Sequence, residues 1–78
     1  MDDPALAAMM RFPDRRSIIE SLSRRDEGFR SLCADLAEAE AALDRWQASS
    51  SPVKDARCDE YAALIESLAA EIEAKIGE

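Results

Sequence analysis

The sequence contains no histidine, and it has only two glycines and two cysteines among its 78 residues. Without histidine it lacks the commonest general base and the commonest metal ligand of proteins. Gly28 and Gly77 are too far apart to form a glycine-rich phosphate loop. Carboxylates are abundant, but we expect them on solvated helix faces with no pocket to activate them. We therefore expect no catalytic residues, no metal site, no cofactor and no enzymatic activity.

Long apolar runs and two-residue alternation are also missing. No apolar stretch approaches the ~18 residues of a membrane span, so we expect no membrane contact. The segment Ala5–Met10 is too short for a signal-peptide core, and an acidic N-terminus precedes it. Free cysteines are typical of a reducing compartment, so we expect a soluble, cytoplasmic protein. Because no segment alternates apolar and polar residues, the pattern typical of a half-buried β-strand, we predict no strands.

The net charge of −7 is placed unevenly. Residues 1–31 carry six acidic residues and six arginines, whereas residues 32–78 carry eleven acidic and four basic residues and account for the whole excess. An acidic second half disfavours nucleic acid and anionic membranes as partners. The simplest interpretation of these acidic side chains is a solvated helix surface.

Two apolar series with alternating steps of three and four residues dominate the second half, and each predicts one stripe on a helix. The series are Phe29, Leu32, Leu36, Ala39, Leu43 and Trp46, and then Cys58, Tyr61, Ile65, Leu68 and Ile72. A short serine loop separates them, in which Ser51 can cap a helix and Pro52 suits a first helical position. We predict helices over about 26–48 and 52–76, packed as antiparallel neighbours.

Folding the chain at the serine loop sets a register that brings the small Ala39 opposite the large Tyr61, as interdigitating layers require. In this register Cys33 faces the neighbourhood of Leu68 on the second helix. Leu68 is ten residues from Cys58, which is roughly 15 Å at the rise of a helix. A disulfide requires Cα atoms within about 7 Å of each other. We therefore expect two free thiols.

The first dozen residues are predicted as a flexible leader, 1–12. Asp3 and Pro4 could cap and begin a short helical turn there, so a docked segment is the alternative. Phe12 and Pro13 mark the boundary, because the residue before a proline avoids helical geometry.

A short helix over about 14–24 should follow the leader. The segment Ser17–Glu20 matches a capping box, although Pro13 or Asp14 could start the helix earlier. Asp26 is a good cap for a new helix, so we predict a break near residues 24–27, with one continuous helix as the alternative.

The predicted fold class is therefore all-α: an antiparallel two-helix hairpin, coiled-coil-like, preceded by a short N-terminal helix, in a single domain over residues 13–78. A two-helix seam covers only a narrow stripe of each helix. We expect a third helix, a second copy or a larger partner to complete the core. The short helix could cover the end near Phe29 and Ile72.

The candidate partner contacts are seven side chains with reasons to reach outside the chain. They are Arg15, Arg16, Arg24, Arg25, Arg30, Trp46 and Leu64. The arginines favour planar contact to carboxylate or phosphate, although pairing with acidic residues of the same chain is the favoured explanation, because charges balance in this region. Trp46 is either a core anchor or a docking aromatic. Leu64 lies beside the seam, where a two-helix hairpin leaves it uncovered.

The apolar spacing resembles that of the YdcH-like small proteins of bacteria, over roughly residues 12–76. The resemblance rests on Phe12-Pro13, Ile18 or Ile19, Leu22, Asp26, Phe29 and Leu32, followed by Tyr61, Leu64 and Ile72. It implies a cytoplasmic bacterial protein with a short helix before a helical hairpin, no established biochemical role and no functional residues to carry over. The arginine-rich first helix, the alanine-rich return helix and Trp46 depart from the pattern.

These observations favour a non-catalytic helical interaction module that acts as a homo-oligomer, a small subunit or an adaptor. The alternative is a protein that binds an anionic partner, such as RNA, DNA or a phosphorylated protein, through the N-terminal arginines.

Overall fold

The computed structural model describes residues 3–77, which form helices joined by short turns. The helices are α1 (Leu6–Arg11), the 3-10 turn η1 (Pro13–Arg15), α2 (Arg16–Arg25), α3 (Glu27–Gln47) and α4 (Lys54–Ile76). No strand occurs within the described part of the chain, so the prediction of an all-α protein is confirmed. The molecule measures 42 × 26 × 21 Å.

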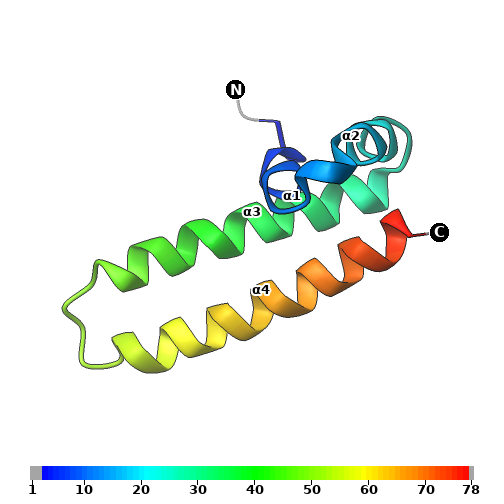
Figure 1. Ribbon diagram of the computed structural model, residues 1–78. Helices are drawn as coiled ribbons and strands as arrows, with labels where there is room; N and C mark the ends of the chain where they lie inside the picture. The colour runs from blue at the N-terminus through cyan, green and yellow to red at the C-terminus, as the bar shows by residue number, and fades with distance from the viewer. Residues whose placement is uncertain (1–2, 78) are drawn as a thin grey trace.

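The two long helices lie side by side, and the chain reverses direction between them (Figure 1). Turns rather than a cap occupy the loop: the Ser51 hydroxyl accepts from the Val53 N–H at 3.2 Å, and the Ser51 carbonyl accepts from the Lys54 N–H at 3.1 Å. Helix α4 therefore begins at Lys54, two residues later than predicted, with no side-chain cap. The prediction that Ser51 caps this helix is wrong, because its hydroxyl is used within the turn.

The break between α2 and α3 falls at Asp26, within the predicted range. Asp26 is extended, with φ −127° and ψ 106°, and its Oδ1 accepts from the Phe29 N–H at 3.1 Å. A side-chain acceptor at this position satisfies one of the unpaired N–H groups of the first helical turn. This local cap starts α3 in a new direction, and the alternative of one continuous helix is wrong.

Residues 3–12 do not form a free leader. Asp3 Oδ1 accepts from the Ala5 N–H at 2.9 Å and starts the turn before α1. Ala5, Ala8 and Met9 are buried, and α1 packs against α3. The docked alternative is therefore the one observed, because the small alanines let α1 approach α3 closely.

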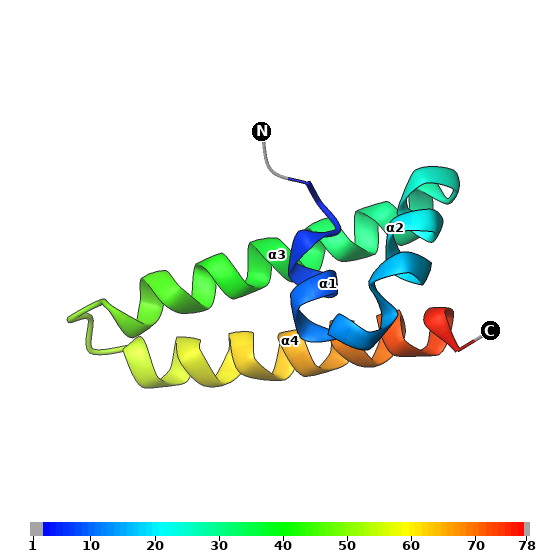
Figure 2. The same cartoon turned by 45° about the horizontal axis from the view of Figure 1, so that its top comes forward.

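Helix α2 begins at Arg16, after η1 has already started the helical turn, and no side chain caps it. The predicted capping box over Ser17–Glu20 is not formed, because Ser17 lies inside the helix rather than before it. Figures 1 and 2 show α2 at the end of the molecule away from the loop and α1 over the middle of the long helices, and both pack against α3.

One buried cluster joins all four helices. Its members are Ala5, Ala8, Met9, Ile19, Phe29, Cys33, Leu36, Ala39, Ile65, Leu68, Ile72 and Ile76. Helices α1 and α2 thus form a third layer, which we call the N-terminal layer, over part of the α3–α4 seam. Ile76, the last residue of α4, is buried within the chain.

The N-terminal layer also changes which face of α3 is buried. Cys33 is fully buried, whereas Leu32, its neighbour in the predicted seam, is only half-buried. Helix α3 therefore buries a wider stripe than a two-helix seam requires, because it contacts α1 and α2 as well as α4.

Candidate functional site

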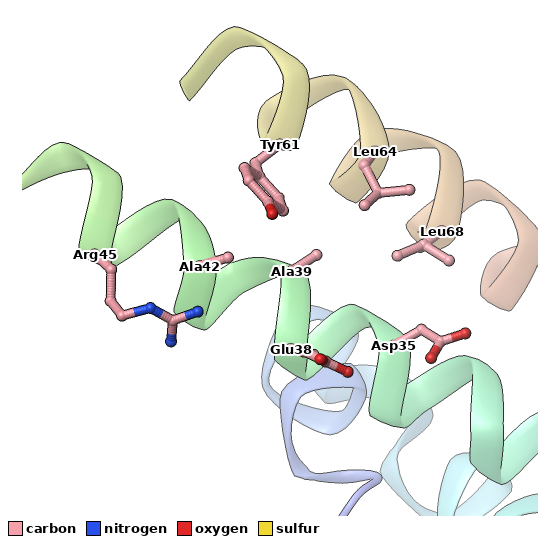
Figure 3. A pocket seen from close by; sticks show the side chains of 8 residues that line it. All are labelled: Asp35, Glu38, Ala39, Ala42, Arg45, Tyr61, Leu64 and Leu68. Carbon is pink, nitrogen blue, oxygen red and sulfur yellow. The ribbon is translucent and has the colours of Figure 1, made fainter. Parts of the chain in front are cut away.

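A groove runs between α3 and α4 on a side that the N-terminal layer does not line (Figure 3). Its volume is about 330 Å³. We call it the open groove, and it is lined by Asp35, Glu38, Ala39, Ala42 and Arg45 of α3 and by Tyr61, Leu64 and Leu68 of α4. All lining residues come from the two long helices, so the groove is a product of their packing.

The floor of the open groove is apolar because small and large side chains face each other across it. Ala39 and Ala42 are buried on α3, while Tyr61, Leu64 and Leu68 project from α4 toward them (Figure 3). Alanine side chains leave space that a larger residue on α3 would fill. Leu64 remains 45% exposed, which makes it the most accessible large apolar side chain in the groove.

The rim of the open groove carries charges of both signs on one helix. Asp35 and Glu38 lie on the side of Ala39 away from the loop, and Arg45 lies toward the loop. All three are exposed. Within residues 3–77 no ion pair involves any of them, so these charges are available to a partner.

A second hollow of about 430 Å³ lies on the other side of the seam, beside α1. Its lining is largely polar: Arg11, Glu40, Leu43, Asp44, Gln47, Ala62, Ile65 and Glu66. Arg11 Nη2 lies 3.3 Å from Glu40 Oε2 and ties α1 to α3 across this hollow. Internal contacts therefore already use part of its rim, in contrast to the open groove.

The predicted partner contacts fall in separate places. Leu64 lies in the open groove, and Trp46 is half-buried near the end of α3 without lining the groove. The five arginines lie on η1, α2 and the first turn of α3. The structure therefore does not bring Leu64, Trp46 and the arginines together into one site.

Two of the five arginines contact their own chain. Arg30 Nη1 donates to the Ser23 carbonyl at 2.8 Å and satisfies an acceptor near the C-terminal end of α2. Arg24 lies 3.8 Å from Glu20, one helical turn away. Arg15, Arg16 and Arg25 are exposed.

Sequence reasoning placed Ala39, Tyr61 and Leu68 in the seam and named Leu64 as a contact, but it missed the four other groove residues. The steps from Asp35 to Glu38, Ala42 and Arg45 are three, four and three, which is a second helical stripe beside the predicted seam. The stripe was not recognised because three of its four members are charged and resemble ordinary surface residues. Only the packing of α4 alongside them makes this stripe one wall of a groove.

Metal-binding groups and reactive thiols are the other features that could mark a site. Residues 3–77 hold no group of three potential metal ligands. Both cysteines are free, and burial, with Asp3 as a lesser cause, raises the pKa of the Cys33 thiol to about 11, which suppresses its nucleophilic form.

None of the helices in this part of the chain combines the length and apolar character of a membrane span. No protein-family model, curated protein or solved structure matches the chain.

Proposed function

We propose that this protein is a non-catalytic helical interaction module, a small subunit or adaptor that acts in the cytoplasm through protein–protein contacts. The working unit is the antiparallel, coiled-coil-like hairpin of α3 and α4, which the N-terminal layer stabilises on one side. The observation that carries the proposal is the open groove, where the half-exposed Leu64 stands beside Tyr61 and Leu68 above two small alanines.

A groove between two antiparallel helices suits a third helix. An amphipathic helix laid into such a groove buries its apolar stripe and leaves its polar face in water. Leu64 is 45% exposed, so covering it would contribute about 1 kcal/mol, roughly half the value of a fully buried leucine. The charged rim would then orient the partner, because rim charges affect orientation and association rate more than affinity.

An anionic partner is the weaker alternative. Of the five arginines proposed for RNA, DNA or a phosphorylated protein, Arg24 and Arg30 already have partners within the chain. The open groove has two acidic residues on its rim and one basic residue. The resemblance to the YdcH-like proteins stays a prediction, and it agrees with a hairpin that lacks catalysis.

Site-specific crosslinking in cells that express the protein naturally tests the proposal. A photoreactive amino acid at Leu64 should crosslink to another polypeptide, because Leu64 is exposed in the open groove. The same amino acid at Ala70, an exposed position about 120° around α4 from Leu64 and outside the groove, is the matched control and should not. Equal crosslinking at both positions, or none at Leu64, contradicts the proposal.

A further inference from the structure

The charges on the rim of the open groove form a pattern that is complementary to itself. Glu38 and Arg45 lie on the same side of α3, seven residues apart, which is about 10 Å along a helix. They are too far apart to pair within one chain, where partners lie three or four residues apart. No ion pair within the described residues involves Glu38 or Arg45.

We infer that the open groove receives a second copy of this protein, docked antiparallel about a two-fold axis that brings Arg45 of each copy to Glu38 of the other. The inference rests on the proposed function, since it names the partner of the same groove. A two-fold axis between Ala41 and Ala42 is equidistant from Glu38 and Arg45 along α3. Symmetry then repeats the pair, so that one contact yields two.

The side chains at this axis allow close approach. Ala42 is buried in the groove floor, and alanine on both copies lets the two α3 helices lie near each other. Tyr61, which lines the same part of the groove, supplies apolar area beside the axis. The contact between the two copies also covers Leu64. The groove thus combines a small-residue crossing point with larger side chains on its flank.

The charges favour one register over its competitor. An axis centred on Ala39 would place the most apolar part of the groove in the middle of the contact. It would, however, bring Glu38 of one copy beside Glu38 of the other and leave Arg45 closer to Asp35 than to Glu38. Like charges placed together across an interface disfavour that arrangement. The register centred near Ala42 pairs Arg45 with Glu38 and keeps the two Glu38 side chains about 10 Å apart along the helices.

A standard interface buries about 800 Å² on each partner, so the contact between two copies extends beyond the open groove along α3 and α4. Helices α1 and α2 do not line the open groove. The net charge of −7 opposes association, but at about 0.15 M salt the screening length is about 8 Å, which weakens repulsion between distant charges.

Charge reversal combined with mixing tests the inference. Sedimentation equilibrium at about 0.15 M salt should give a dimer at roughly 100 micromolar protein. Arg45→Glu alone and Glu38→Arg alone should each weaken dimerisation by about tenfold or more, since two attractive contacts become two repulsive ones. An equimolar mixture of the two variants should regain the wild-type affinity, because every contact in the mixed dimer is again attractive. Arg25→Glu, the same charge change on α2, should leave dimerisation unchanged.

Two results would overturn the inference: a wild-type monomer at that concentration, or a mixture that associates no better than the separate variants. Circular dichroism checks that each variant is folded, and if one variant does not fold, the double variant Glu38→Arg with Arg45→Glu must still dimerise like the wild type. Crosslinking at Leu64 separates this failure from failure of the proposed function. A Leu64 crosslink to a different polypeptide, with a monomeric protein in solution, would reject the second copy and keep the interaction module.

Discussion

The buried thiol of Cys33 offers a sensitive probe of whether α1 stays docked. Cys33 is fully buried, and it belongs to the same core cluster as Ala5, Ala8 and Met9. Burial is the larger cause of its raised pKa, and the nearby negative charge of Asp3 is the second cause. The pKa rises from 9.0 to about 11.

The magnitude follows from the thiolate fraction. At about pH 8, a thiol with a pKa of 9.0 is about one-tenth ionised, whereas a thiol with a pKa of about 11 is about one-thousandth ionised. Because only the thiolate is nucleophilic, alkylation of Cys33 should be about 100-fold slower in the native protein than in the denatured chain. Steric protection by the packed helices slows the reaction further, since the reagent must wait for local opening.

The assay is iodoacetamide labelling of a Cys58→Ser variant, with and without urea, followed by mass spectrometry. Asp3→Asn is a matched control, because it keeps an acceptor oxygen for the Ala5 N–H and removes only the charge. Because Asp3 is the smaller cause of the raised pKa of Cys33, the substitution should raise the native labelling rate of Cys33 only modestly. Native labelling as fast as labelling in urea would refute the docking of α1 over Cys33.

The same pKa shift links stability to pH. A thiol whose pKa is raised in the folded state stabilises that state fully below its unfolded pKa of 9.0. The contribution is lost as the pH rises from 9.0 to about 11 and amounts to at most about 3 kcal/mol. Urea unfolding across this range should show the loss in the wild type and a smaller loss in Cys33→Ala, which has no thiol to ionise. Identical pH profiles for the wild type and Cys33→Ala would contradict a raised pKa for the Cys33 thiol.

Three further substitutions test the packing and the caps by urea unfolding. Leu36→Ala should lower the free energy of unfolding by about 2–5 kcal/mol, because Leu36 is fully buried, and a loss well under 1 kcal/mol would contradict its place in the core. Asp26→Ala should cost about 1 kcal/mol through the lost cap on the Phe29 N–H, whereas Asp26→Asn keeps an acceptor and should cost much less. Arg11→Gln should cost under about 1 kcal/mol, because its ion pair with Glu40 is partly exposed, and a larger loss would show that this pair holds α1 in place.

Local signals in the sequence predicted the helix boundaries closely. Helix α3 was predicted over 26–48 and occupies 27–47, because the Asp26 cap acts within a few residues of its own position. The start of α2 was less accurate, since Ser17–Glu20 matches a capping box that the preceding 3-10 turn makes unnecessary. Boundaries of this kind depend on neighbouring residues, so sequence reasoning reaches them to within one or two residues.

The choice between adjacent apolar residues required the tertiary structure. Leu32 and Cys33 are neighbours on α3, and Ile18 and Ile19 are neighbours on α2. In each pair the second residue is fully buried, whereas Leu32 is half-buried and Ile18 is 41% exposed. Adjacent positions on a helix point about 100° apart, so an apolar pair shows that one of the two faces the core without showing which. The direction from which another helix packs decides it.

The sequence by itself therefore determined the helical class, the break at Asp26, the reversal before α4 and the absence of histidine chemistry, because these depend on composition and on interactions between near neighbours. The tertiary structure alone decided that α1 docks and that the open groove exists. Asp35, Glu38 and Arg45 are ordinary surface residues in the sequence. They become the rim of a groove only because α4 packs beside them and the N-terminal layer covers another part of the seam.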